Sequence, residues 1–282
     1  MGQGTRSEYY TGVILVMIAA VTYSTAGLFT KGVEAGSWEV IFWRGLFAAA
    51  FTAVWTVNRG VSRKNFFGMG YSGWAVAVVG ALGTAAFIPA FKLTTIANVS
   101  LIYAVSPLVA ALLAWIAIGE KVSARMLMGC VCALLGVAII VSGSIGQISF
   151  NGDLLALWMT VAMASIMVTY RKYPDTPVAG PAVMQSVLLL PCAMILGTPF
   201  DVARAEVFIL AAFGLLFAIA SVTLAEGAKR VPSGQTALLS SLETPFAPFF
   251  AFMVFTEMPN MPTLLGGSVV LFAVLISIRN DT

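Results

Sequence analysis

Ten segments of this chain are long, apolar and almost free of charged side chains. The hydrocarbon core of a bilayer is about 30 Å thick, so a helix that rises 1.5 Å per residue needs roughly 20 apolar residues to cross it. Within that core every backbone N–H and C=O needs a partner inside the protein, and a helix supplies these partners by itself. We therefore expect an all-α integral membrane protein with ten transmembrane helices.

The connections between these segments are short and contain Gly, Pro and Asn, which are typical of turns. The predicted spans are 10–33, 37–57, 71–91, 98–118, 123–142, 153–170, 177–197, 205–228, 234–255 and 261–278. None of the connections is long enough to form a soluble domain that could hold an active site.

The composition agrees with a membrane protein and excludes several other classes. Hydrophobic residues make up 60% of the chain and charged residues only 10%, whereas about a quarter of the residues in a soluble domain are charged. The three cysteines lie in apolar segments and the chain has no histidine, so we expect no metal site and no cofactor. We expect no nucleic-acid partner. The partners predicted are a small-molecule substrate and the lipid bilayer, for a monomer or, as the open alternative, a homodimer.

The second half of the chain repeats the punctuation of the first. An apolar segment that contains Pro107 returns as one that contains Pro245, and in this alignment Ser106 falls on Thr244. Ten spans then divide into two repeats of five, residues 1–145 and 146–282. A repeat with an odd number of spans inserts with opposite topology, so we expect two inverted five-helix repeats.

The basic residues predict the orientation of the chain. Eleven of the fifteen Lys and Arg residues fall on the side of the N-terminus, three fall on the other side, and Arg44 lies within a span. Cytoplasmic loops of membrane proteins carry an excess of Lys and Arg. We therefore expect both termini in the cytoplasm, and the short loops suit a bacterial inner membrane.

Two long strings resemble a known family. SPLVAALLAWIAIGEK (106–121) and AKRVPSGQTALLSSLETPFAPFFAF (228–252) are similar to the fourth and ninth spans of the drug/metabolite transporter superfamily, EamA type, and Trp43-Arg44-Gly45 fits its second span. The resemblance implies ten helices, inverted repeats, internal termini and export of amino acids, other metabolites or cationic drugs. The amino-acid exporter branch is the one that this chain resembles. One departure is the sequence TEMP at 256–259, where the family repeats a Gly-Glu turn.

The paired prolines point to a binding site at mid-membrane. A proline has no N–H and leaves the carbonyl four residues back without its helical partner, here the carbonyls of Tyr103 and Ser241. Matched interrupted helices in two halves of a transporter mark its substrate site. The alternative is that each proline only kinks a packed helix.

Glu243 is the only acidic residue near the centre of a span. A carboxyl group there is costly unless it faces a wet cavity, finds a partner or is protonated. It is therefore a candidate proton carrier, or a counter-charge for a substrate ammonium. The alternative is a structural hydrogen bond, because members of the family with different substrates often carry a glutamate before this proline.

Arg44 lies well inside the second span, with Gln185 at the equivalent place in the other half. Its guanidinium could receive a substrate carboxylate; alternatively, its long stem could extend to the membrane surface. Aromatic and polar residues near mid-span complete the candidate pocket, although each could equally be packing. The full set of candidate substrate-binding residues is Glu243, Arg44, Tyr23, Ser24, Phe87, Tyr103, Pro107, Trp158, Gln235, Ser241, Thr244 and Pro245.

These features predict a secondary transporter rather than an enzyme, because an intramembrane enzyme would need clustered Asp, His or Lys within its spans. We expect it to export small metabolites, amino acids with aromatic or other apolar side chains above all, by alternating access around a midplane cavity. An exporter of cationic drugs is the alternative within the same superfamily. A non-transporting scaffold or channel subunit is the alternative outside it. Downhill exchange and proton antiport both remain open.

Overall fold

The computed structural model describes residues 3–58, 60, 68–94, 96–142, 149–255 and 261–278, and all regular structure in these ranges is helical. The predicted boundary between the repeats at residues 145 and 146 lies outside the described residues, as does the sequence TEMP at 256–259. The fold is therefore all-α, as the apolar segments predict.

The described ranges contain eight helical segments that are long and apolar enough to cross a membrane. They comprise α1 (Gln3–Tyr23) with α2 (Ala26–Lys31), α3 (Ser37–Asn58), α5 (Gly70–Leu93), α6 (Ile96–Tyr103) with α7 (Ser106–Ile118), α9 (Phe150–Lys172), α10 (Ala179–Val187) with α11 (Leu190–Leu196), α12 (Arg204–Ala228), and α13 (Ser233–Ser240) with α14 (Glu243–Phe255). Two further helices, α8 (Ala124–Ser142) and α15 (Met261–Ile278), have shorter apolar stretches. A short 3-10 turn, η1, spans Pro199–Asp201.

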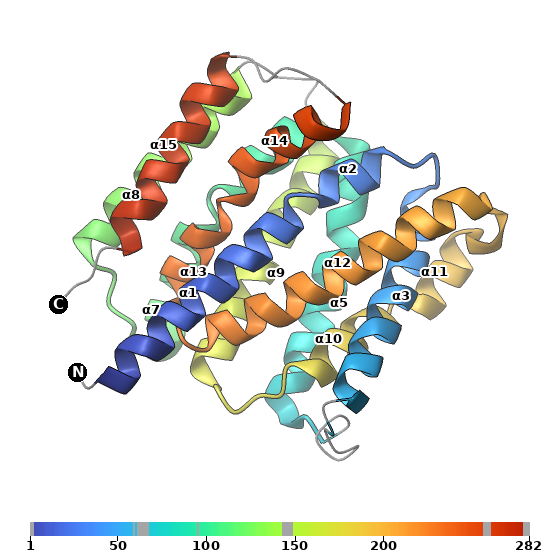
Figure 1. Cartoon of the computed structure of the whole chain (residues 1–282), viewed down its shortest axis with the longest axis horizontal. Helices are drawn as coiled ribbons and strands as arrows, with labels where there is room; N and C mark the ends of the chain where they lie inside the picture. The colour runs from blue at the N-terminus through green and yellow to red at the C-terminus, as the bar shows by residue number, and fades with distance from the viewer. Residues whose placement is uncertain are drawn as a thin grey trace.

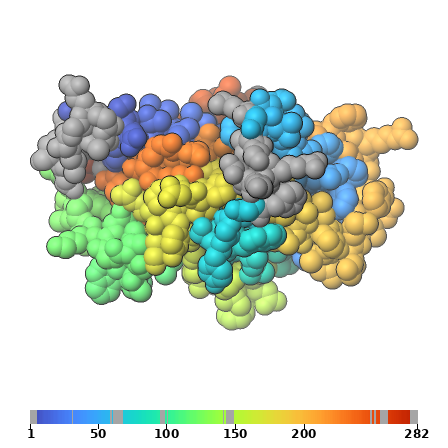
Figure 2. All heavy atoms as spheres, turned by 90° about the horizontal axis from the view of Figure 1, so that it is seen from below, coloured from blue at the N-terminus to red at the C-terminus, as the bar shows by residue number. Residues whose placement is uncertain are grey.

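The helices form two layers with one extra pair beside them. In one layer α12 packs between α1 and α3, and α13 and α14 pack on α1. In the other layer α5 packs between α9 and α10, and α6 and α7 pack on α9. Figure 2 looks along the layers, with dark blue and orange atoms above green, yellow and cyan atoms. The pair α8 and α15 lies apart at one side (Figure 1).

The contacts of one half recur in the other. The contact of α1 with α12 corresponds to that of α9 with α5, and the contact of α12 with α3 corresponds to that of α5 with α10. The pairs α3–α10, α7–α13 and α8–α15 are each formed by equivalent helices of the two halves. This reciprocity is the pattern that a two-fold relation between two repeats produces.

Glycines allow α8 and α15 to approach closely. A Cβ atom placed on Gly136 would lie 2.8 Å from the carbonyl oxygen of Gly266. A Cβ atom placed on Gly266 would likewise collide with the backbone of α8. Small residues let helix backbones approach in membranes, where packing replaces the hydrophobic effect as the force between helices. The two repeats are therefore joined by this pair as well as through the layers.

The predicted interruptions occur near both prolines. The first break falls between α6 and α7 just before Pro107, and the second falls between α13 and α14 just before Pro245. The prediction that the Ser241 carbonyl lacks a partner is wrong, because the backbone N–H of Thr244 donates to it with an N···O distance of 3.1 Å. The chain tightens into a short turn at this break, which satisfies the group that the proline would have left open.

Two further breaks were not predicted. The first separates α1 from α2 at Ser24 and Thr25, and the second separates α10 from α11 at Leu188 and Leu189. At the first break the Ser24 hydroxyl donates to the Val21 carbonyl and the Thr25 hydroxyl donates to the Thr22 carbonyl. Such side-chain bonds offer the backbone an alternative to the helical pattern. The break therefore needs no proline.

Candidate functional site

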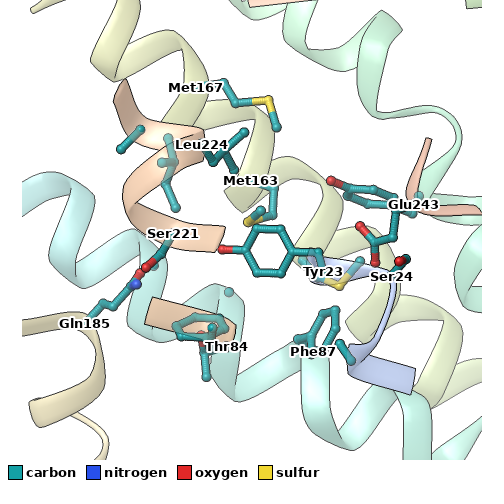
Figure 3. Close-up of a pocket in the computed structure, with 18 of the residues that line it drawn as sticks. Tyr23, Ser24, Thr84, Phe87, Met163, Met167, Gln185, Ser221, Leu224 and Glu243 are labelled. Carbon is teal, nitrogen blue, oxygen red and sulfur yellow. The ribbon is translucent and has the colours of Figure 1, made fainter. Parts of the chain in front are cut away.

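A cavity lies between the two layers. It holds about 1300 Å³ of atom-free space, its open mouth included. Residues from α1, α2, α3, α12 and α14 form one wall, and residues from α5, α6, α9 and α10 form the other. Figure 3 shows side chains of both walls directed into it. Concave, mainly apolar sites with a few polar groups are the usual form of small-molecule sites in proteins.

The structure brings seven of the twelve predicted residues to the wall of this cavity. They are Tyr23, Ser24, Arg44, Phe87, Tyr103, Glu243 and Thr244. The remaining five are not part of the wall: Pro107, Trp158, Gln235, Ser241 and Pro245. Pro107 and Ser241 are buried at the two helix breaks, where they shape the chain and leave the lining to their neighbours.

Trp158 and Gln235 face elsewhere for identifiable reasons. On α9 the cavity side is set by Met159, Met163 and Met167, and Trp158 is turned from Met159 by one residue, about 100° around the helix. Its side chain is 50% exposed on the outside of the protein. Gln235 accepts a hydrogen bond from the Tyr9 hydroxyl, 3.1 Å between oxygens, where α13 meets α1.

Glu243 is the acidic group of the cavity. It is the first residue of α14, so the break before this helix carries it to mid-span. In Figure 3 its carboxylate is directed toward Ser24, at the break between α1 and α2. Within the described part of the chain no side chain forms an ion pair or hydrogen bond with it. A half-buried carboxylate without a protein partner is suited to a cation, an ammonium group or a proton.

Arg44 is the basic group of the cavity. Only 2% of the residue is exposed, so its stem does not extend to the membrane surface. The guanidinium carbon lies 4.0 Å from the ring centroid of Phe217 and 5.5 Å from that of Phe213. Such cation–π contacts stabilise a charge without using its N–H donors. Among the described residues the Nε atom has no hydrogen-bond partner.

The neighbours of Arg44 in sequence hold it in place. Trp43 donates from Nε1 to the Pro199 carbonyl at 2.6 Å, which fixes α3 to η1. Gly45 faces Ser186 of α10, whose carbonyl oxygen would lie 3.6 Å from a Cβ at that glycine. From the other side, Gly214 of α12 packs on the Arg44 carbonyl. In the Trp43-Arg44-Gly45 motif, Trp43 therefore anchors the helix, Arg44 supplies the charge and Gly45 allows close packing.

Tyr23 extends across the cavity. Figure 3 shows its ring between Ser24, on the side of Glu243, and Ser221. No ion pair joins Arg44 to Glu243 in the described chain. The cavity therefore keeps two separate charged groups of opposite sign.

A second set of polar residues, from α5, α10 and α12, lines the cavity and was not among the predicted residues. Gln185, Ser221 and Thr84 all line the wall. In Figure 3 the Gln185 amide and the Ser221 side chain point toward one another. The pairing of Gln185 with Arg44 across the repeats was the one signal in the sequence that could have identified this group.

The apolar part of the wall is also clearer in the structure than in the sequence. Met159, Met163 and Met167 lie on one face of α9 at intervals of four residues, opposite Phe87 of α5. The flexible thioether of methionine adapts to differently shaped partners. The spacing was visible in the sequence, but it is equally typical of a packed helix face.

The lining residues differ in exposure. Tyr170 and Ala228 at one end of the cavity are buried, whereas Gly27, Phe87 and Ala247 near the other end are partly exposed. Directly beyond Tyr170, Arg171 donates to the Glu120 carboxylate at 3.3 Å and to the Lys229 carbonyl at 3.2 Å. The described residues contain no group of three or more His, Cys, Asp or Glu that could hold a metal ion.

Two of three comparisons with known proteins find a match. The model of the EamA-like transporter family matches residues 10–142 and 150–279. A solved structure described only as the crystal structure of a protein is similar, with a TM-score of 0.81 at 18% identity. That match covers 95% of this chain and 96% of the other, and it supports the fold alone. A comparison with curated proteins finds no match.

Proposed function

The chain belongs to the EamA-like transporter family, and from this premise we propose that it exports small amphipathic metabolites, foremost amino acids with aromatic or other apolar side chains. Family membership supports membrane transport. The substrate class rests on one observation: a single cavity presents a guanidinium and a carboxylate that are not paired with each other, between apolar walls. An amino acid has the matching carboxylate, ammonium and side chain.

In this proposal each part of the substrate has its own place. The carboxylate binds Arg44, whose planar guanidinium matches a carboxylate with two parallel hydrogen bonds. The ammonium binds Glu243. The side chain lies against Phe87 and Met163, which supply a ring face and an adaptable apolar surface.

The membrane arrangement belongs to the same proposal. Ten helices would cross the bacterial inner membrane, with α8 and α15 as the fifth and tenth, in two inverted repeats with both termini in the cytoplasm. The excess of Lys and Arg on one side supports this orientation. In Figure 1 the start of α1 and the end of α15 lie toward the same side of the molecule.

Transport would proceed by alternating access. With this orientation the end of the cavity at Tyr170 faces the cytoplasm, and in this proposal it is the closed end. Rocking of the helices around the cavity would open that end and close the other. Export down the gradient of the substrate needs no coupling ion, and Glu243 is the residue that would carry a proton if exchange is coupled.

The test is counterflow in proteoliposomes. Vesicles preloaded with an unlabelled amino acid are given the same labelled amino acid outside, with and without an imposed pH gradient. Faster uptake than in protein-free vesicles establishes carriage. An effect of the pH gradient that is absent in Glu243→Gln assigns proton coupling to Glu243. If no amino acid exchanges in protein shown to be folded, this substrate class is wrong.

An exporter of cationic drugs is the second candidate. Glu243 together with the rings of Tyr23, Tyr103 and Phe87 would also suit an organic cation. Arg44 argues against it, because a buried guanidinium in the same cavity repels a second cation. Exchange of a labelled quaternary ammonium compound without any exchange of amino acids would favour the drug exporter.

A further inference from the structure

We propose that Gln185 completes, with Arg44, a donor-rich subsite for the substrate carboxylate, and that the Gln185 amide makes the cavity select carboxylate-bearing substrates. This inference rests on the proposed function, since it concerns the same cavity. It adds a residue from the second repeat to the recognition of one substrate group.

Gln185 is buried in the wall of the cavity. Only 8% of the residue is exposed, and its side chain lines the cavity. Gly80 of α5 makes room for it, because a Cβ atom at that glycine would collide with Gln185 Oε1. In the described chain no hydrogen bond to this amide is found. A buried amide has two donors and an acceptor to satisfy, so one without protein partners is suited to a ligand or water.

Gln185 and Arg44 lie on two helices, α10 and α3, that pack against each other. At this contact Gly45 of α3 faces Ser186 of α10. Arg44 and Gln185 are the residues directly before these two, and both line the cavity. The same helix contact therefore delivers a guanidinium from one repeat and an amide from the other.

Ser221 of α12 lies beside the Gln185 amide. Ser221 donates from its hydroxyl to the Ala218 carbonyl at 3.1 Å, which fixes its side chain against the helix. Figure 3 shows this side chain and the Gln185 amide directed toward one another, and the ring of Tyr23 lies between them and Glu243. No acidic residue lines the cavity on this side in the described chain. The Ser221 hydrogen is used in its bond to Ala218, so the donors left for a ligand are those of Gln185 and Arg44, which suit a carboxylate better than a cation.

The Gln185 amide would make the cavity specific for substrates that carry a carboxylate. A site built from N–H donors strongly rejects an analogue that lacks the matching acceptor, because the buried donors are then left unpaired. Exchange of the amide for a carboxylate would give Arg44 a permanent partner within the protein. The subsite would then be occupied by the protein itself, and a substrate carboxylate would be repelled.

The experiment uses four probes that share a phenylethyl body: L-phenylalanine, 3-phenylpropionate, L-phenylalaninamide and 2-phenylethylamine. The first two carry a carboxylate and the last two do not. Binding to the full-length purified protein is measured by thermal shift in detergent, and exchange by counterflow. In Gln185→Glu we expect the affinity for the two carboxylates to fall about tenfold or more, with the affinity for the two amines unchanged or increased.

Two control variants test whether the effect of Gln185→Glu is specific to the carboxylate subsite. Gln185→Met keeps the length of the side chain, adds no charge and should weaken the carboxylates without repelling them. Gln235→Glu makes the same amide-to-acid change outside the cavity and keeps the acceptor for Tyr9, so it should bind all four probes as the wild type does. A variant is compared only if it gives a single folded peak in size exclusion.

The outcomes separate this inference from the proposed function. If the wild type exchanges phenylalanine and Gln185→Glu weakens carboxylates and amines equally, the subsite is wrong and the transporter stands. If the wild type exchanges only the amines, the proposed substrate class fails. If 3-phenylpropionate does not stabilise the wild type at all, the carboxylate subsite is overturned whatever phenylalanine does.

Discussion

The Glu120 carboxylate and the Arg171 guanidinium form an ion pair of 3.3 Å that joins the first repeat to the second. The other carboxylate oxygen of Glu120 accepts from the backbone N–H of Ser233, at 3.2 Å, where α13 begins. Arg171 also donates to the carbonyl of Lys229 at the end of α12. Glu120, together with Arg171, thus links the ends of α9 and α12 to the start of α13, next to the Tyr170 end of the cavity.

We expect Glu120→Ala to reduce stability by about 1–2 kcal/mol, because it removes both a partly exposed ion pair and the acceptor at a helix N-terminus. Glu120→Gln should lose less, since its amide oxygen can still accept from Ser233. Thermal unfolding in detergent checks this order. Equal stability of all three proteins would show that the contact contributes nothing.

We expect Glu243→Gln to weaken the binding of 2-phenylethylamine about tenfold or more, because the amide lacks the charge that an ammonium needs. The same variant should bind 3-phenylpropionate as the wild type does. Thermal shift with both probes makes the comparison. A uniform loss for both would mean that Glu243 supports the fold of the cavity rather than the ammonium.

We expect Met163→Trp to reduce counterflow of L-phenylalanine at least tenfold, because a larger ring on the inner face of α9 fills the space for the substrate side chain. Trp158→Ala is the matched control on the same helix. Trp158 faces outward, so its truncation should leave exchange within about twofold of the wild type. A reversal of these two effects would place the substrate on the other face of α9.

We expect Gly136→Leu to destabilise the protein, by about 1–3 kcal/mol or more, since its side chain would meet the backbone of α15. Leu135→Ala, at a position that is 57% exposed on the outer face of α8, serves as the control. Thermal unfolding of the two variants is the measurement. If Gly136→Leu unfolds like the wild type, the close approach of α8 and α15 does not hold the repeats together.

The sequence predicted the helices well because one physical rule, the thickness of the hydrocarbon core, sets their length. The breaks before Pro107 and Pro245 could be predicted because a proline has no backbone N–H to continue the helical hydrogen bonds. The break at Ser24 and Thr25 could not be predicted, because hydroxyl side chains satisfy the backbone there and leave no proline as a signal.

Within the site, charged residues were easier to predict than apolar ones. Arg44 and Glu243 are costly in a membrane, so a cavity was the natural explanation for each. The sequence could not show that Trp158 lies off the cavity wall, because a membrane helix is apolar on all sides and nothing in its pattern separates the lipid face from the cavity face. The three methionines of α9 were missed for the same reason. Contacts between helices decide both cases, and a single helix does not contain them.

The ring of Tyr23 has a consequence for the handedness of the substrate. Because this ring lies between the Gln185 amide and Glu243, a bound amino acid would be fixed at its carboxylate and its ammonium in a defined direction. The methionines of α9, which also line the cavity, would then provide a third point of contact. Three such points distinguish mirror images, so this cavity should favour one enantiomer of an amino acid over the other.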